Sequence, residues 1–297
     1  MTSKKLYGLN KYFLEFVSLF DMGKIPKVLM LTGKKGQGKF TLVHHLLSYI
    51  FDNKNYDLKN TTINNSNKLF NNIKENYNPD IVYYKCKNND VKIDDIRSLR
   101  INLQKSSISE SKRFIIFDDI EYLNTNCVNA LLKTIEEPSE INHFILINNK
   151  GQNLLETLKS RSIEIMFFLN NIEKISIIEK IISDFQLEQK IDLSNSTLTP
   201  GNYLKFNKLI LDEKIDISDK LIVNIKKLLT LNKFKKNIDY LNLTIYLINQ
   251  YYFKKSKNEQ DINYYNNKRV DIIKKLDESN KLNLNHVNLI TELENYI

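Results

Sequence analysis

Three of the chain's seven glycines stand close together, in a pattern that binds phosphate in many proteins. Gly33, Gly36 and Gly38 are followed at once by Lys39. In such a loop the backbone N–H groups cradle phosphate oxygens, and the lysine reaches the outer phosphates. The spacing therefore predicts a site for a nucleotide such as ATP or ADP with Mg²⁺. The alternative is a tight turn that packs a helix against a sheet and holds no nucleotide.

The residue after the lysine departs from this pattern. Phosphate-binding loops place a Ser or Thr there, whose hydroxyl binds Mg²⁺, but this chain has Phe40, with Thr41 one position later. One residue along a helix means a rotation of about 100° and a rise of about 1.5 Å, so Thr41 does not simply replace the missing ligand. Nucleotide binding stays open, whereas we do not expect productive hydrolysis.

Two adjacent carboxylates, Asp118 and Asp119, follow the apolar run 114–117. A carboxylate at the end of a strand beside a phosphate loop can hold the water shell of Mg²⁺, and Asp118 is the candidate. Enzymes that hydrolyse ATP usually have a glutamate next, which orients the attacking water. Asp119 is one methylene shorter, and misplacement by about 1 Å costs roughly 10²-fold in rate. Alternatively, both carboxylates only cap the element that follows.

Short apolar runs alternate with helical periodicities along the first half of the chain. Each run has the length of a strand that is buried on both faces. This alternation predicts an α/β domain with a parallel sheet that helices cover on both faces. The predicted strands are residues 28–32, 81–84, 114–117, 144–147 and 163–168, with helical patterns over 42–50, 93–103 and 128–135.

Beyond about residue 170 the apolar spacing predicts helices throughout, and Thr199-Pro200-Gly201 separates a short helical region from a longer one. Residues 52–78 are polar and rich in asparagine, and we expect an extended surface insertion there. We therefore predict three domains. Residues 1–168 form a domain of the nucleotide-binding type, residues 169–208 form a small helical domain, and residues 209–297 form an all-helical domain.

The chain has 297 residues and a formal net charge of +9, and all but five of its 44 basic residues are lysine. Because this bias resembles the effect of AT-rich codons, the charge alone is weak support for nucleic-acid binding. Cys86 and Cys127 cannot form a disulfide framework or a four-thiolate zinc site, so we expect buried reduced thiols and no metal site. No apolar run approaches the ~20 residues that span a bilayer, and no signal-peptide core follows Met1. We therefore expect a soluble, cytoplasmic protein.

A longer motif adds a family resemblance. Residues 129–138 (Asn-Ala-Leu-Leu-Lys-Thr-Ile-Glu-Glu-Pro), which follow 114–123, resemble the N-A-L-L-K-T-L-E-E-P signature of bacterial DNA polymerase III clamp-loader subunits of the AAA+ class. Residues 23–27 are similar to the lead-in to the family's first strand, residues 93–99 to its I-x-x-I-R-x-L helix, and Ser160-Arg161-Ser162 to its Ser-Arg-Cys motif. The resemblance implies an AAA+ phosphate-loop domain, a helical lid and an all-α C-terminal collar that assembles subunits.

Within this family the chain is more similar to the delta prime type than to the hydrolysing gamma/tau type. Some delta prime subunits have an impaired loop of the form G-K-x-T, which Gly38-Lys39-Phe40-Thr41 matches. Pro200-Gly201 is similar to the start of their second sensor helix, and Leu204 stands where hydrolysing members have an arginine. The four-cysteine zinc module of many members is missing, because residues 52–78 contain no cysteine.

The resemblance also implies roles for several residues. In related complexes the Ser-Arg-Cys arginine reaches the ATP of a neighbouring subunit in a ring-like pentamer, and Arg161 matches that arginine. The implied partners are the gamma/tau and delta subunits, the sliding clamp and primed DNA. Arg97, Arg100 and Lys105 lie where similar loaders face DNA, so they are candidate phosphate contacts. The alternatives are a helix-end salt bridge for Arg161 and a solvated helix face for the other three.

Three classes of function remain open on these grounds. The first is a loader subunit whose own ATPase activity is weak or absent. The second is an enzyme, either a gamma/tau-like ATPase or an autonomous phosphate-loop ATPase or nucleotide kinase; Lys39 favours it, whereas Phe40, Asp119 and Leu204 oppose it. The third is a stand-alone DNA-binding module that uses the net charge. The chain contains nothing like a polymerase carboxylate site, so any polymerase activity would belong to a complex.

Overall fold

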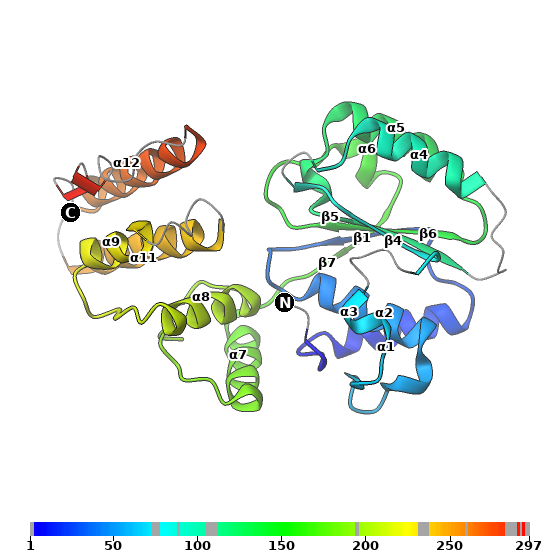
Figure 1. The fold of residues 1–297 in the computed structure, drawn as a ribbon, viewed down its shortest axis with the longest axis horizontal. Helices are drawn as coiled ribbons and strands as arrows, with labels where there is room; N and C mark the ends of the chain where they lie inside the picture. Colours follow the sequence, from blue (N-terminus) through cyan, green and yellow to red (C-terminus); the bar gives the residue numbers. More distant parts are fainter. Residues whose placement is uncertain are drawn as a thin grey trace. The chain divides into compact units, whose positions relative to one another are not determined.

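A computed structural model of the chain (Figure 1) describes residues 3–72, 78–87, 90–104, 112–193, 196–230, 238–258, 261–282, 290–291 and 293–294. The chain divides into two compact units. Unit 1 contains residues 1–186 and 198–202, and unit 2 contains residues 187–197 and 203–297. The candidate nucleotide site and Arg161 both belong to unit 1.

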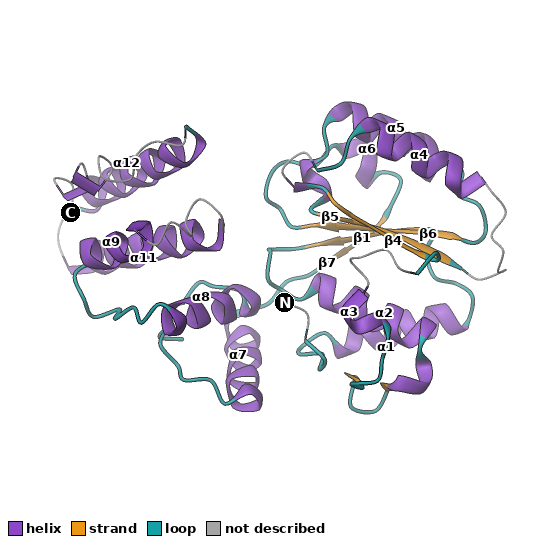
Figure 2. Ribbon diagram, in the orientation of Figure 1, coloured by secondary structure: helices purple, strands orange, loops and turns teal. Residues whose placement is uncertain are grey.

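Unit 1 is built on a five-stranded sheet. Its strands are β1 (Val28–Thr32), β4 (Ile81–Lys85), β5 (Arg113–Asp118), β6 (Asn142–Asn148) and β7 (Ile163–Met166). They follow one another in the order β4-β5-β6-β1-β7, and all four pairings are parallel (Figure 2). Every residue of β1 and β6 is buried, as expected for strands covered on both faces. The predicted parallel sheet is therefore confirmed, although β7 ends at residue 166 instead of 168.

Helices cover both faces of this sheet (Figure 1). One face carries α1 (Asn10–Asp21) and α2 (Lys39–Phe51); the other carries α4 (Ile93–Gln104), α5 (Thr125–Ile135) and the short α6 (Glu156–Lys159). Leu29 and Leu31 of β1 pack into the core cluster of α1 and α2, whereas Met30 packs into the cluster of α4 and α5. Because successive strand residues point to opposite faces, one fully apolar strand contributes to both cores.

The asparagine-rich insertion is more compact than its composition predicts. Its described part contains a short turn η1 (Asn53–Asn55), an antiparallel hairpin of β2 (Tyr56–Asp57) and β3 (Thr62–Ile63), and α3 (Leu69–Asn72). Tyr56, Ile63 and Leu69 are buried in the core cluster of α1 and α2, and the Tyr56 hydroxyl pairs with His45 Nδ1 at 2.8 Å. The expectation of an extended insertion was wrong for these residues, because a few apolar anchors suffice to hold a polar segment against the core.

The C-terminal region is helical, as predicted. α7 (Asn171–Phe185) begins with a capping box in which Asn170 and Glu173 satisfy each other's backbone N–H groups. The helices that follow are α8 (Pro200–Asp212), α9 (Leu221–Thr230), α11 (Ile238–Asn258) and α12 (Ile262–Lys281). The division into a lid over 169–208 and a collar over 209–297 stays a prediction. None of the helices in the described ranges is long and apolar enough to cross a membrane.

Candidate functional site

The phosphate loop connects β1 to α2, as its sequence predicts. Gly36 (φ 88°) and Gly38 (φ 90°) have the left-handed backbone that glycine tolerates best. Lys39 begins α2 and is 2% exposed. Its Nζ donates hydrogen bonds to the carbonyl oxygens of Gly33 (2.6 Å) and Lys34 (3.0 Å). Burial lowers the pKa of Lys39 to about 8, against the opposing pull of nearby carboxylates.

Thr199 and the first residues of α8 pack on this loop within unit 1. The Gly201 N–H donates to the Gly36 carbonyl at 2.8 Å, and the Thr199 hydroxyl donates to the Lys35 carbonyl at 2.7 Å. A Cβ atom on Gly36 would collide with Thr199 Oγ1, and one on Gly201 would lie 2.9 Å from the Gly36 oxygen. Glycine at both positions therefore permits the close approach, and several carbonyl groups of the loop bond within the chain.

Phe40 fills the position where a phosphate loop needs a hydroxyl ligand. Its ring lies parallel to that of His44, with centroids 6.3 Å apart, and edge-on to that of Tyr83 at 5.4 Å. The ring packs against the core cluster of α1 and α2. Thr41 is half-buried at the next position of α2, about 100° further around the helix. An oxygen ligand is thus replaced by an apolar contact.

Asp118 and Asp119 lie together at the carboxyl end of β5, and both are buried. The Lys85 Nζ lies 2.5 Å from Asp118 Oδ2 and 2.7 Å from Asp119 Oδ2. The Lys35 Nζ, from the phosphate loop, lies 3.1 Å from Asp119 Oδ2. The two carboxylates are therefore paired with two ammonium groups from other parts of the chain.

Uncharged donors complete this cluster. The Asn149 amide nitrogen donates to Asp119 Oδ1 (2.6 Å) and Asp118 Oδ1 (3.2 Å), and the Tyr83 hydroxyl donates to Asp118 Oδ2 (3.1 Å). Burial alone would raise the pKa of Asp119, but the hydrogen bond from Lys85 and the neighbouring positive charges lower it to about 2. Burial also opposes the charge of Lys85, yet the two aspartates outweigh it and raise the pKa of Lys85.

The strand order explains why these side chains meet. β4, β5 and β6 are neighbours in the sheet, and their carboxyl ends share one edge. Lys85 ends β4, Asp118 ends β5 and Asn149 follows β6. Lys85 and Asn149 were not predicted as site residues, although Lys85 directly follows the predicted strand 81–84 and Asn149 comes two residues after the predicted strand 144–147, which is the signal that was available. Lys35 and Thr199 were also missed, because their contacts depend on tertiary structure alone.

The remaining titratable candidates do not form a metal centre. Within the described ranges, no group of three or more His, Cys, Asp or Glu side chains is placed to hold a metal ion. Cys86 and Cys127 are buried free thiols, as predicted, and burial raises the pKa of each.

Arg161 lies at the opposite edge of the sheet from the phosphate loop. It precedes β7, in which Ile163 pairs with Leu29 and Met166 pairs with Thr32 of β1. Because these strands are parallel and the phosphate loop follows Thr32, the length of β7 separates the two features by about 13 Å along the strand direction. Arg161 is therefore placed away from the chain's own loop.

Glu136 holds the Arg161 guanidinium at the surface. The Arg161 Nε donates to Glu136 Oε1 at 2.7 Å, and Nη1 donates to the Thr157 carbonyl (3.2 Å) and the Ser160 hydroxyl (3.3 Å). Glu136 directly follows α5 as its C-cap residue, so the 129–138 motif supplies the partner. The salt bridge that we considered as the alternative role of Arg161 is present, but 38% of the arginine side chain remains exposed.

The candidate DNA contacts lie on or near α4. Arg97 and Arg100 are both exposed, and the Arg97 Nη1 pairs with Asp94 Oδ1 at 3.0 Å. Lys105 lies outside the described residues. The Arg97–Asp94 pair is an ordinary i,i+3 surface pair, so both the DNA-contact interpretation and the solvated-face interpretation of this helix stay open.

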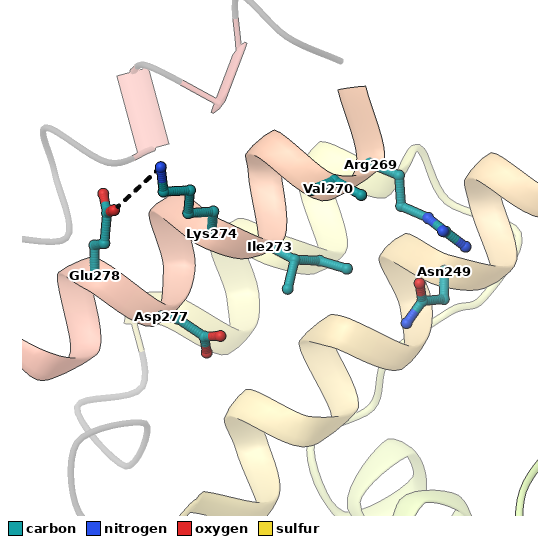
Figure 3. A pocket seen from close by; sticks show the side chains of 7 residues that line it. All are labelled: Asn249, Arg269, Val270, Ile273, Lys274, Asp277 and Glu278. Carbon is teal, nitrogen blue, oxygen red and sulfur yellow. Dashed lines mark ion pairs between the residues drawn. The ribbon is translucent and has the colours of Figure 1, made fainter. Parts of the chain in front are cut away.

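A pocket in unit 2 lies between α11 and α12. Asn249 of α11 and six residues of α12 line it, and Arg269 and Ile273 extend toward α11 (Figure 3). Its charged lining includes Arg269, Asp277 and the Lys274–Glu278 pair at 3.9 Å. Charges of both signs line this pocket, and it contains no phosphate loop.

A parallel sheet in this order, with a phosphate loop after β1 and paired acids after β5, defines an AAA+-type phosphate-loop protein. A family profile described as "DNA polymerase III, delta subunit" matches residues 8–170, more than half of the chain. The chain therefore belongs to this DNA polymerase III delta subunit family.

The similar proteins include more than one type of subunit. The DNA polymerase III subunit delta prime of Buchnera aphidicola subsp. Schizaphis graminum is 29% identical over 154 residues, 52% of this chain and 46% of that protein. The gamma subunit of the same organism is 26% identical over 160 residues, 53% of this chain and 42% of that protein. The chain thus spans less than half the length of these curated relatives. Among solved structures, a gamma subunit-related protein of Thermotoga maritima has 17% identity and a TM-score of 0.47, over 93% of this chain and 97% of that one.

Proposed function

We propose that this chain is a delta prime type subunit of a clamp loader, and that it supplies Arg161 to the ATP site of a neighbouring subunit. The observation that carries this proposal is the exposed position of Arg161 at the amino edge of the sheet, away from the chain's own loop. A guanidinium presents a planar fork to phosphate oxygens and stabilises charge in the transition state. With only five arginines among 44 basic residues, an arginine at this motif supports a role that lysine does not fill.

The proposal assigns weak or no ATP hydrolysis to the chain's own pocket. Phe40 offers no oxygen to a metal ion, and Lys39 bonds to carbonyl groups of its own loop. The contact between Gly201 and Gly36 engages the same loop from outside. Leu204 stands where the resemblance places the arginine of hydrolysing members, so a second cationic contact to phosphate is also missing.

The proposed assembly is a hetero-pentamer with gamma/tau and delta subunits, which opens a sliding clamp and loads it on primed DNA in the cytoplasm. In this assembly residues 169–208 act as the lid domain and residues 209–297 as the collar. Arg97 and Arg100 would contribute sequence-independent phosphate contacts, each of which makes binding weaker as salt rises. Polymerase activity belongs to other chains of the complex.

The test is ATP hydrolysis by a loader reconstituted from this chain and its cellular partners. Arg161→Ala should remove DNA-stimulated hydrolysis at the adjoining site while the subunits still co-purify, because an arginine finger contributes roughly 10³- to 10⁵-fold. Lys159→Ala is the matched control. Lys159 lies two residues away, its side chain is also partly exposed, and its loss should leave hydrolysis unchanged. Unchanged hydrolysis in Arg161→Ala would remove this residue from the mechanism.

A gamma/tau-like ATPase is the second candidate, because the glycine loop with Lys39 is intact and a gamma subunit is among the relatives. The isolated chain separates the two candidates. Turnover of ATP with Mg²⁺ at about 1 per second or faster by the purified chain would favour the ATPase, since enzymes typically reach such rates. The delta prime proposal expects turnover far below that rate.

A further inference from the structure

Both oxygen atoms of Asp118 accept hydrogen bonds from side chains of this protein. Oδ2 accepts from the Lys85 ammonium at 2.5 Å and from the Tyr83 hydroxyl at 3.1 Å. Oδ1 accepts from the Asn149 amide at 3.2 Å. The carboxylate that the phosphate-loop pattern assigns to the Mg²⁺ water shell is therefore surrounded by hydrogen-bond donors.

Asp119 is enclosed in the same way. Its Oδ1 accepts from Asn149 at 2.6 Å and from Lys35 at 3.2 Å, and its Oδ2 accepts from Lys85 at 2.7 Å and from Lys35 at 3.1 Å. Its side chain is 1% exposed, so water does not compete with these donors. All four carboxylate oxygens of the pair thus have at least one partner that brings a hydrogen atom toward them.

These residues do not fit the Mg²⁺ ion that the fold family implies. Mg²⁺ demands octahedral oxygen ligands at about 2.1 Å and keeps several waters. A cation would meet N–H and O–H hydrogens at each carboxylate oxygen, and it would have to expel the Lys85 ammonium, which bridges both acids. The adjacent aromatic side chain of Phe40 supplies no replacement ligand.

The local charge gives the same result. Asp118 and Asp119 contribute two negative charges, and Lys85 and Lys35 contribute two positive charges within 3.1 Å of them. The charge of the two carboxylates is therefore neutralised before any ligand binds. A divalent cation would leave two surplus positive charges beside these buried carboxylates. In sites that bind a metal, the ion itself is usually the largest local charge.

We propose that the Lys85 ammonium is a built-in replacement for the divalent cation, so that the Asp118–Asp119 pair of this protein binds neither Mg²⁺ nor Mn²⁺. Lys39 does not fill this role, because its ammonium is bonded to the loop carbonyls. Lys85 instead ties the carboxyl ends of β4 and β5 together without a ligand. This inference deepens the proposed function and rests on it, because the proposed function already treats this pocket as a site without ATP hydrolysis.

Removal of the Lys85 charge should therefore create a metal site. The experiment is titration of the purified full chain with Mn²⁺, followed by the loss of the free-ion signal in electron paramagnetic resonance. We expect no binding by the natural protein at about 1 mM Mn²⁺. Lys85→Met should bind Mn²⁺ at concentrations about tenfold lower than this, because two buried carboxylates then lack a counter-charge. Lys24→Met, at an exposed position of unit 1, is the matched control and should behave like the natural protein.

Further variants identify the site and guard against misfolding. Asp119→Asn added to Lys85→Met should abolish the new Mn²⁺ site. Lys85→Gln keeps a donor of similar length without the charge, and it should also gain Mn²⁺ binding. If either lysine variant is unstable, Mn²⁺ should raise its melting temperature and should leave that of the natural protein unchanged.

Two results would overturn the inference. One is Mn²⁺ binding by the natural chain that Asp118→Asn or Asp119→Asn removes. The other is that neither lysine variant gains Mn²⁺ binding or metal-dependent stability. All these measurements use the chain without nucleotide, DNA or other subunits, so they do not depend on Arg161; failure of the loader assay with Arg161→Ala would leave them intact.

Discussion

The two edges of the same sheet place their charged side chains in opposite ways. At the carboxyl edge, the Asp119 side chain is 1% exposed and bonds to ammonium groups of Lys85 and Lys35. At the amino edge, the Arg161 side chain is 38% exposed and pairs with Glu136, which is itself 47% exposed. At the carboxyl edge the carboxylates are buried among donors of the same chain, whereas at the amino edge both members of the ion pair are partly exposed.

This difference teaches which edge is available to another molecule. Removal of one partner from a buried ion pair leaves an uncompensated charge and is strongly destabilising. An exposed pair contributes only about 0–1 kcal/mol, so its arginine can exchange one anionic partner for another at little cost. Substitutions at the carboxyl edge should therefore change stability, and substitutions at the amino edge should change activity in an assembly.

The largest expected effect is at Arg161. Arg161→Lys keeps the charge but loses the planar fork, and we expect hydrolysis at the adjoining site of the loader to fall about 10²- to 10³-fold. The free energy of unfolding of the isolated chain should change by less than about 0.5 kcal/mol, because the pair with Glu136 is exposed. Single-turnover ATP hydrolysis and urea unfolding measure the two effects. A lysine that supports full activity would show that the fork geometry is not needed.

The next effect tests the buried lysine at the carboxyl edge. The pKa of Lys39 is about 8 in the folded chain and 10.5 when exposed, so the unfolded state keeps a proton that the folded state loses between these values. The free energy of unfolding therefore rises with pH across this window, by up to about 1.4 kcal/mol per pH unit. We expect a total rise of about 2 kcal/mol.

Lys39→Met should remove this rise. Urea unfolding at about pH 7, pH 8.5 and pH 10 gives the difference between the two proteins, in which the contributions of other titrating groups cancel. We expect the natural protein to gain stability relative to Lys39→Met as the pH increases. A constant difference would mean that Lys39 titrates at its ordinary pKa and that its burial has no electrostatic cost.

A third prediction concerns the contact of α8 with the loop. In Gly201→Ala the new methyl group would lie 2.9 Å from the Gly36 oxygen and 3.0 Å from its Cα, and backbone atoms do not move aside easily. We expect a loss of about 1–2 kcal/mol of stability and faster hydrogen exchange over residues 33–39. Lys208→Ala, at an exposed position of the same helix, is the control. Unchanged exchange of the loop would contradict the close contact.

The sequence predicts the sheet well because each strand of unit 1 has a local signal. The apolar runs that became β1, β5 and β6 are long enough to be recognised alone, and the glycine loop and Asp118–Asp119 mark the ends of two of them. α1 was not predicted, although Phe13, Phe16 and Val17 are buried in its inward face. The hairpin in the asparagine-rich insertion was missed because each of its strands contributes a single buried apolar residue, Tyr56 and Ile63.

The partners of the site residues were harder to predict than the residues themselves. Lys85, Asp118 and Asn149 are far apart in the sequence and meet only because β4, β5 and β6 are adjacent. The position of Lys85 directly after a predicted strand marks it as a residue of the sheet edge, but it does not show which side chains it meets there. The pairing of Arg161 with Glu136 likewise depends on the packing of α5 beside the turn before β7.

The smallest effect that we predict is at Glu136, which acts as a positioning residue for Arg161. Its carboxylate accepts from Nε and thereby fixes the plane of the guanidinium, while the fork itself stays exposed. Glu136→Ala should lower the maximal hydrolysis rate of the loader about three- to tenfold with little change in KM, because ground-state binding of ATP does not involve this residue. Glu136→Gln retains an acceptor oxygen and should recover most of the rate.

The matched control is Glu137→Ala, which changes the adjacent exposed glutamate and should have no effect. If Glu136→Gln is as impaired as Glu136→Ala, the negative charge of Glu136 matters more than the orientation it gives to the Arg161 guanidinium. The amino edge would then depend on electrostatics, as the carboxyl edge does.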